Sequence, residues 1–486
     1  IGKLYSPLFG DSGLLWQEKD GYRYRTLSGE EFIFNEEGLL QRKVDSRGNT
    51  DTYFYDEKGQ LIRVKGANGG ELFYRYNEEG NLIRVKDHTG REVQLWYSYG
   101  KLRKYVNACG HAYTYSYNVN GRLESVLTPR GIVGVKNTYD GVNRVVKQEM
   151  PDGGVLELAY DDEHRRTYVT EPGGRRIIYE SDERFRNIRT IYEDGEEQYA
   201  YNERNQRTLL VDKLGNKTRY RYDEKGNLTQ VINALGEKTS FIYDEASHLL
   251  RVEVGERVVR SHSYDEAGRL VSLRDALGRS REAVYDERGL LKEVIQADGS
   301  RVSFLRDERG NVTQLMNPYG EKIFYTYDAL NRLTGVKDGE GNTTAYTYDA
   351  ANRILSMTNP EGNTKTFRYN ESGKVVEIRD FDGESIAYSY QETGKVESIT
   401  DKGGRQWKRS YDRQGNLVEE IRPTGVVCTL QYDVHNRLVR KEEQDTGNEG
   451  TARMMEWAYD LAGNLVEVRA GEGKEILKKE TYTYDA

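Results

Sequence analysis

The chain is poor in the residues that usually hold a long protein together. Its 486 residues include 2 Cys, 7 Pro, 5 Met and 4 Trp. Two cysteines, Cys109 and Cys428, cannot build a disulfide framework, so the fold needs another source of stability. Hydrophobic residues make up only 36% of the chain, which is a small share for one deep apolar core.

Charge and hydropathy exclude two further classes. The chain has 72 Lys and Arg against 80 Asp and Glu, so its formal net charge is −8. It therefore lacks the basic excess that is typical of a nucleic-acid binder. No run of about 18 apolar residues occurs, which excludes a membrane-spanning helix. The first residues show neither an initiator Met nor a signal-peptide pattern, so we expect a fragment or a processed product.

Glycine and tyrosine are abundant instead, with 50 Gly and 38 Tyr, and they recur every 21 residues or so. Between Phe34 and Tyr432 this spacing picks out 20 residues, which we call marks. Eighteen of the 20 marks are Tyr or Phe, and Ser181 and Arg306 are the exceptions. Counting each mark as position 0, Asp is common at +1, Leu or Val at +6 and Val, Leu or Ile at +9, while Gly stands at +14 after 17 of the 20 marks. Such self-similarity indicates a repeat architecture.

The repeat divides the chain into three parts. We expect a pre-repeat segment at residues 1–33, regular repeats at 34–458 and looser terminal repeats at 459–486.

Each unit is predicted to contain two tight turns. One follows the Asp at +1, and the other ends at the Gly at +14. Six of the seven prolines stand at +12, as Pro360 does before Gly362. This spacing suits a type I β-turn with Pro in its second place and Gly in its fourth, and Asp at the first place caps such a turn through its own side chain.

Two stretches of about six residues lie between the turns, which is an ordinary strand length. One of them alternates cleanly, as in Thr218, Tyr220 and Tyr222, and this predicts a strand with one packed face. In the other stretch, positions +6 and +9 lie an odd number apart. We therefore expect either a β-bulge there or a strand with both faces partly covered.

Tight turns reverse the chain, so successive strands should be antiparallel neighbours. We predict an all-β fold: a long antiparallel meander of hairpins that coils because strands twist, and a wall that winds encloses a space. A β-propeller and a β-solenoid are the alternatives.

The recurring residues favour structural rather than catalytic roles, because a catalytic residue is not repeated at fixed spacing along a chain. The positions that define the pattern are Tyr222, Asp223, Gly226, Leu228, Val231, Gly236, Tyr264, Asp265, Gly268, Leu270, Tyr327, Asp328, Leu333, Gly341, Tyr348, Asp349, Pro360 and Gly362.

No motif predicts a catalytic, cofactor-binding or metal site. The turns at 338–342 and 380–384 are rich in Asp but lack the full ligand series of a calcium loop. Cys109 and His111 form one Cys-x-His pair without a second pair, which is weak evidence for zinc; we expect an accessible or incidental thiol. Tyrosines could stack on sugars, but we expect them to pack between strands with their hydroxyls on a wet face.

The unit resembles the YD repeat of the Rhs family, which includes bacterial polymorphic toxins, wall-associated proteins, the shell subunits of insecticidal toxin complexes and the teneurins. The match rests on segments such as Tyr222-Asp223-Glu224-Lys225-Gly226-Asn227-Leu228 and extends from about residue 34 to the end. The resemblance implies a hollow β-shell, or β-cocoon, of which this chain is a fragment. The family's self-cleaving aspartates have no match, because no Asp-Pro pair occurs.

The resemblance also implies a function, which is structural and not enzymatic. The expected role is the shell of a secreted or cell-surface toxin that encapsulates and protects a C-terminal toxin domain of the same polypeptide, a domain absent from this chain. Secretion-machinery or cell-surface components and glycans are further candidate partners. Two alternatives stay open: a surface adhesin or glycan-binding protein, and a cryptic hydrolase in the degenerate segments 97–117 and 432–486.

Overall fold

The computed structural model describes residues 4–5, 13–26, 29–46, 48–447, 452–473 and 475–484. Within these residues the chain forms 46 strands and no helix, and all strands belong to one sheet. Each strand pairs antiparallel with the strand before it and the strand after it in the sequence, as β22, β23 and β24 do. The predicted meander is confirmed. The propeller and solenoid alternatives are wrong, because the sheet is neither divided into blades nor built from parallel strands.

The first half of the sheet extends to the middle of the chain. Its strands are β1 (Leu4–Tyr5), β2 (Leu14–Glu18), β3 (Gly21–Arg25), β4 (Glu31–Phe34), β5 (Leu40–Val44), β6 (Thr50–Tyr55), β7 (Leu61–Lys65), β8 (Glu71–Tyr76), β9 (Leu82–Asp87), β10 (Glu92–Ser98), β11 (Lys101–Val106), β12 (Ala112–Tyr117), β13 (Leu123–Leu127), β14 (Val133–Tyr139), β15 (Val145–Glu149), β16 (Val155–Asp161), β17 (Arg166–Thr170), β18 (Arg176–Ser181), β19 (Asn187–Tyr192), β20 (Gly195–Tyr201), β21 (Arg207–Val211), β22 (Lys217–Tyr222) and β23 (Leu228–Ile232).

The second half continues the same sheet without interruption. Its strands are β24 (Lys238–Tyr243), β25 (Leu249–Val254), β26 (Arg257–Tyr264), β27 (Leu270–Asp275), β28 (Ser280–Tyr285), β29 (Leu291–Ile295), β30 (Arg301–Arg306), β31 (Val312–Met316), β32 (Lys322–Tyr327), β33 (Leu333–Lys337), β34 (Thr343–Tyr348), β35 (Ile354–Thr358), β36 (Thr364–Tyr369), β37 (Val375–Arg379), β38 (Ser385–Tyr390), β39 (Val396–Thr400), β40 (Gln406–Tyr411), β41 (Leu417–Ile421), β42 (Val426–Tyr432), β43 (Leu438–Asp445), β44 (Arg453–Tyr459), β45 (Leu465–Glu472) and β46 (Glu475–Thr481).

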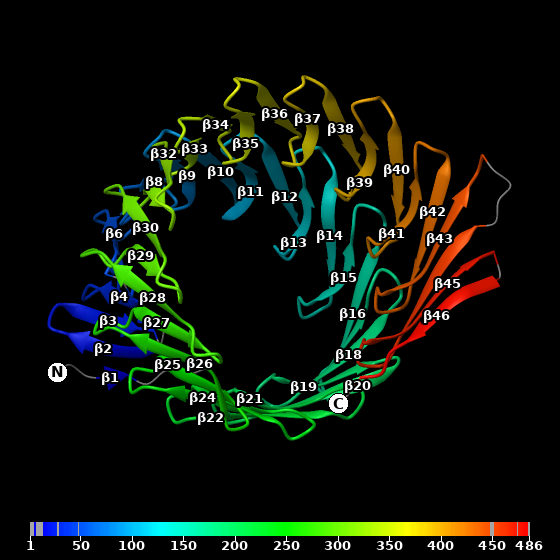
Figure 1. The fold of residues 1–486 in the computed structure, drawn as a ribbon, viewed down its shortest axis with the longest axis horizontal. Coiled ribbons are helices and arrows are strands. Elements are labelled where there is room, and N and C mark those ends of the chain that lie inside the picture. Colours follow the sequence, from blue (N-terminus) through cyan, green and yellow to red (C-terminus); the bar gives the residue numbers. More distant parts are fainter. Residues whose placement is uncertain are drawn as a thin grey trace.

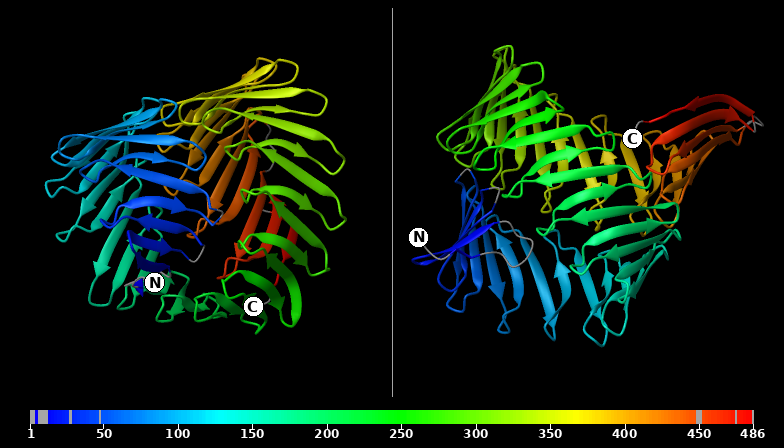
Figure 2. Two further views of the ribbon diagram at one scale, coloured as in Figure 1. Left: turned by 90° about the vertical axis from the view of Figure 1, so that its left-hand side faces the viewer. Right: turned by 90° about the horizontal axis from the view of Figure 1, so that it is seen from below.

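The sheet winds round one axis almost twice (Figure 1). Seen along that axis it forms a ring, and the side views show the second winding lying beside the first (Figure 2). The sheet does not close on itself, because β1 pairs only with β2 and β46 only with β45. Strand twist, summed over so many strands, is what turns a flat meander into this coil.

A β-bulge recurs in the hairpins and explains the odd spacing of positions +6 and +9. In the β22–β23 hairpin, Arg221 pairs with Gln230 but Tyr222 pairs with Leu228, so Thr229 is left over. The extra residue returns Leu228 to the face that carries Tyr222, and Val231, opposite Tyr220, lies on that face too. The bulge thus gathers the apolar positions of each unit on one side of the sheet.

The wall is thin. Its accessible surface is 30022 Å², against about 18,000 Å² for a compact protein of this mass. Within the described residues the buried hydrophobic side chains are only Ile177, Cys428 and Met454. The small apolar share of the sequence is therefore matched by a fold without a deep core. No helix in the described part of the chain has the length and apolar character needed to cross a bilayer.

Candidate functional site: the wall and its seam

In most units the tyrosine at position 0 joins its hairpin to the one before it. Pairing between β23 and β24 ends at Gln230 and Ser240, so the backbone of Leu228 lies beyond the last paired residues. The hydroxyl of Tyr243 donates a hydrogen bond to the Leu228 carbonyl oxygen at 3.0 Å. The side chain therefore continues the bonding between strands where the backbone ladder ends.

This bond is repeated along the wall, at distances between 2.6 and 3.0 Å, and its acceptor lies near position +6 of the preceding unit. The tyrosines that make it are Tyr55, Tyr76, Tyr117, Tyr139, Tyr160, Tyr201, Tyr222, Tyr243, Tyr264, Tyr285, Tyr327, Tyr348, Tyr369, Tyr390, Tyr432, Tyr459 and Tyr484. Each of these hydroxyls donates to a backbone carbonyl, a partner that the repeat pattern did not predict.

The aspartate at position +1 organises its own turn. Asp265 Oδ1 accepts the backbone N–H groups of Ala267 and Arg269, and its Oδ2 accepts Arg269 Nε at 2.7 Å. Burial raises the pKa of the Asp265 carboxyl, but the hydrogen bonds from Arg269 outweigh burial and leave this pKa below its ordinary value. Gly268 closes the turn with φ +76°, in the left-handed region where Gly is not strained.

The arginine at position +5 links one turn to the next. Arg332 Nε donates to Asp328 Oδ2 at 2.7 Å, and its Nη1 donates to the carbonyl oxygen of Asp349 in the following turn at 2.9 Å. The guanidinium also lies over the ring of Tyr348, 4.9 Å from the ring centre. One side chain therefore connects the Asp and the Tyr of neighbouring units along the edge of the wall.

The other residues that define the repeat lie at the bulges and in the turns. Leu270 and Leu333 pair with Tyr264 and Tyr327 at the bulges of their hairpins. The Pro360 turn is closed by Gly362 N–H donating to the Asn359 carbonyl at 3.0 Å. Positive φ angles are found at the pattern glycines, which are Gly226, Gly236, Gly268, Gly341 and Gly362.

The two windings meet along a seam. His88 Nε2 lies 2.9 Å from the carbonyl oxygen of Ala329, and this nitrogen must carry the proton because a carbonyl only accepts. Arg91 Nη1 donates to the Ala350 carbonyl at 3.1 Å and to Asn352 Oδ1 at 2.6 Å. These partners are more than 240 positions apart in the sequence, so the contacts join one winding to the next.

Two further contacts repeat, within three positions, the 241-position separation of His88 and Ala329, whereas Arg91 reaches residues 259 and 261 positions away, in the next unit. Asp194 meets His435, 241 positions away, and Cys109 Sγ meets Arg353 Nη2, 244 positions away, at 3.7 Å. The turn that contains Asp194 precedes β20 and the turn that contains His435 follows β42, so one winding spans 23 strands. In each contact the turn that ends near position +14 on the first winding meets a Tyr-Asp turn on the second.

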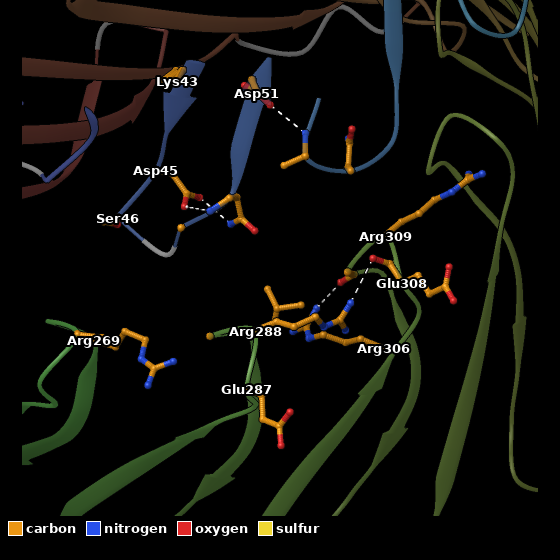
Figure 3. A pocket seen from close by; sticks show the side chains of 18 of the residues that line it. Lys43, Asp45, Ser46, Asp51, Arg269, Glu287, Arg288, Arg306, Glu308 and Arg309 are labelled. Carbon is orange, nitrogen blue, oxygen red and sulfur yellow. Dashed lines mark hydrogen bonds between the residues drawn. The ribbon is translucent and has the colours of Figure 1, made fainter. Parts of the chain in front are cut away.

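The seam is open over one arc, where a cleft of about 1190 Å³ separates the windings. Its two walls carry an excess of opposite charges (Figure 3). Each wall is mixed, and the difference is one of excess. The second winding contributes Arg269, Arg288, Arg306 and Arg309 with Glu287 and Glu308, and the first winding contributes Glu30, Asp45 and Asp51 with Lys43. Arg288 points along its own wall, because its Nη1 donates to the carbonyls of Asp307 and Glu308 at 3.1 Å each.

The residues weighed as metal or catalytic candidates do not converge. Asp338 is occupied by its own turn, since its carboxylate accepts the N–H groups of Glu340 and Asn342 and the Asn342 side chain. Cys109 is half-buried beside Arg353, and Cys428 is buried in β42. Among the described residues, no group of three or more His, Cys, Asp or Glu is placed to hold a metal ion.

The segments suspected of hiding a hydrolase form ordinary strands. Residues 97–117 contribute to β10, β11 and β12, and the described parts of 432–486 contribute to β42 through β46.

Sequence reasoning missed the seam residues altogether. His88, Asp194 and His435 occupy ordinary turn positions in the repeat, and nothing in their neighbourhood marks them. Their partners follow from the number of strands in one winding, which depends on the twist of the folded sheet.

The fold and its site define a class: a repeat protein in which one antiparallel sheet of Tyr-Asp hairpins is coiled into a wall. The model of the Teneurin YD-shell family matches residues 22–109, 70–241 and 200–324, and the RHS Repeat model matches residues 327–364. The chain belongs to the Rhs/YD-repeat family. No curated protein sequence matches it significantly.

Solved structures of toxin complexes share the fold. The crystal structure of TcdB2-TccC3 has a TM-score of 0.60 at 12% identity, and the same complex without its hypervariable C-terminal region has 0.52 at 12%. A Tc holotoxin pore of Photorhabdus luminescens has 0.55 at 11%. The matches cover 97–98% of this chain but 35–36% of the solved chains, so this chain spans about a third of their length.

Proposed function

We propose that the chain is part of the wall of an Rhs-type toxin shell, which encloses another polypeptide and keeps it away from other molecules. The function is steric, and the chain performs no chemistry of its own. The observation that carries the proposal is the seam: a single sheet winds almost twice round one axis, and hydrogen bonds join its successive edges. A coil with joined edges restricts passage through its wall.

The family and the fold support this role. Members of the family build shells from the same repeat, and the structures with the same fold are toxin complexes. We infer that the enclosed polypeptide is the C-terminal toxin domain of the parent protein, and that the shell works outside the cell or at its surface. Components of a secretion machinery or of a cell surface are further partners in this proposal.

Protease protection tests the proposal. A protease-sensitive polypeptide is fused after Ala486, and its digestion is compared with that of the same polypeptide mixed with the chain in trans. Enclosure predicts at least tenfold slower digestion of the fused form. A fusion that replaces Arg91 and His88 by Ala, and so removes two contacts between the windings, is expected to lose part of this protection. Equal digestion of the fused and the mixed polypeptide would overturn the proposal.

Two experiments on the isolated chain distinguish the alternatives predicted from the sequence. Binding of the isolated chain to cell-wall polysaccharide would favour an adhesin. Hydrolysis abolished by one substitution within 97–117 or 432–486 would favour an enzyme.

A further inference from the structure

Gly173 lacks a side chain at a point where the two windings come very close together. It lies in the turn between β17 and β18 on the first winding, and Gln414 lies in the turn between β40 and β41 on the second. A Cβ placed on Gly173 would lie 2.7 Å from Gln414 Cγ and closer still to its Cδ and Nε2. Non-bonded carbon atoms pack at about 3.5–4.0 Å. The Gln414 side chain therefore occupies the space that any other residue at position 173 would need.

The backbone of the turn does not require this glycine. The next residue, Gly174, has φ +88°, and a Cβ there would meet no atom within 4 Å. Gly174 therefore serves the left-handed conformation of the turn. Gly173 lies outside the left-handed region, so an alanine at 173 would carry no such backbone strain. What position 173 has to accommodate is the side chain from the neighbouring winding.

The turn at 412–415 is seated between two successive turns of the first winding. Gly173 receives Gln414 on one side, and on the other a Cβ on Gly154 would lie 3.5 Å from the Arg413 carbonyl oxygen. The cavity left between the windings at this point measures about 120 Å³, against about 1190 Å³ in the open arc. The seam is thus closely packed here.

We propose that Gly173 is a docking notch for Gln414, and that this contact fixes the spacing and the register of the two windings. The notch is the space beside the Gly173 Cα that a Cβ would fill. Hydrogen bonds such as the one from His88 to Ala329 tie the two edges together, and they restrict the spacing less sharply than a side chain that fits against bare backbone does.

The notch distinguishes one register from its neighbours. Counted from the preceding mark, Gly173 stands at +13, where the turns before and after it hold Asp152 and Asp194. A slip of the windings by one unit would set Gln414 against an aspartate, which has a Cβ. The same slip would separate Asp194 from His435. The fit of Gln414 against glycine therefore belongs to the observed register.

This inference deepens the proposed enclosing function and rests on it for its biological value, because a wall excludes other molecules only where its edges stay closely spaced. The test uses the empty chain and no fused polypeptide. Failure of the notch would therefore leave the protease-protection result untouched, and failure of enclosure would leave the contact between the windings standing.

Hydrogen–deuterium exchange on the second winding tests the notch. The amides of Asp412, Gln414, Gly415 and Asn416 are hydrogen-bonded within their own turn, so their exchange reports opening of that turn. Gly173→Ala should push the Gln414 side chain out of the notch. Exchange at 411–417 is then expected to rise roughly threefold to tenfold, although the substitution lies on the other winding.

A double-mutant cycle shows whether the effect passes through Gln414. Gln414→Ala adds no atom and removes the side chain that enters the notch, so it should raise exchange at 170–175 on the first winding. When Gly173→Ala is added to Gln414→Ala, exchange at 411–417 should change by less than about twofold, because the two substitutions remove the same contact.

Gly141 supplies the matched control. It lies in the turn between β14 and β15, at the opposite edge of the first winding. It is outside the left-handed region, and a Cβ there would meet no atom within 4 Å. Gly141→Ala should leave exchange at 411–417 unchanged.

Three results would overturn the proposal. One is that Gly173→Ala leaves exchange at 411–417 as unchanged as Gly141→Ala does. Another is that Gly173→Ala raises this exchange equally with and without the Gln414 side chain. The third is that Gln414→Ala leaves 170–175 unaffected, a result that stays informative even if Gly173→Ala fails to fold.

Discussion

Arg306 Nε donates a hydrogen bond to the Leu291 carbonyl oxygen at 3.3 Å, and its Nη1 donates to the Gly310 carbonyl at 2.8 Å. Arg306 stands at position 0, where every other unit between Phe34 and Tyr432 except that of Ser181 has an aromatic residue, and Leu291 is the acceptor that a tyrosine would use there. The exception in the sequence therefore preserves the bond between hairpins.

We predict that Arg306→Tyr is tolerated, because a tyrosine hydroxyl restores the bond to Leu291. Arg306→Ala removes both bonds and should lower the free energy of unfolding by about 1–2 kcal/mol. Urea unfolding followed by circular dichroism compares the two variants. An equal loss in both would show that the bond to Leu291 contributes nothing.

Tyr348→Phe should destabilise the wall, because the Tyr348 hydroxyl donates to the Leu333 carbonyl at 2.6 Å. The expected loss is about 1 kcal/mol, with the carbonyl left without its donor. Tyr346→Phe in the same strand is the control, since Tyr346 lies two positions away and makes no such bond among the described residues. Hydrogen exchange across 333–348 should rise in the first variant and stay unchanged in the second.

Gly362→Ala should be destabilising for a purely backbone reason. Gly362 has φ +87°, and a Cβ built there meets no atom within 4 Å. The left-handed conformation costs a residue with a Cβ about 1–2 kcal/mol. Gly362→Asn should lose less, because Asn331 and Asn352 adopt φ values of 61° and 65° in equivalent turns. Thermal unfolding midpoints in the order Gly, Asn, Ala are expected; an Ala midpoint equal to that of Gly would contradict this account.

Acid should unfold the wall over a narrow range. In Asp328 and Asp349, burial raises the carboxyl pKa, but hydrogen bonds from Arg332 and Arg353 outweigh it and lower the pKa. For Asp87 the opposing hydrogen bonds from Thr89 and Arg91 lower the pKa to about 2. A lowered pKa means that the stabilisation is fully present above the ordinary Asp pKa of about 4 and is lost as the pH falls through the lowered value.

Melting temperatures at pH 7, 4, 3 and 2 should therefore be similar at the first two values and fall between about pH 4 and pH 2. Asp349→Asn should make the pH dependence shallower, because a neutral amide cannot titrate. The chain already shows that Asn supports the turn: Asn370 Oδ1 accepts the N–H groups of Ser372 and Lys374. An unchanged acid profile in Asp349→Asn would mean that this turn contributes nothing to acid sensitivity.

The repeat itself is readable from the sequence because its causes are local. Gly362 needs a positive φ, Asp265 caps the turn that follows it, and the odd spacing of Leu228 and Val231 requires a bulge. The acceptor of Tyr243 was not foreseen, since it depends on where backbone pairing stops between two hairpins. The meeting of Asp194 with His435 depends on a twist accumulated over 23 strands, and no local pattern records that quantity.

Because one winding spans 23 strands, the contacts between the windings depend on the number of hairpins in the chain. A residue on the seam has a partner only because a fixed number of hairpins lies between the two. Loss or duplication of a single 21-residue unit between Asp194 and Ala329 would shift every later turn along the first edge and would replace all of these partners at once. Tandem repeats usually tolerate such changes, because each unit touches only its neighbours. Here the evolution of repeat number is constrained by contacts made a full circuit away.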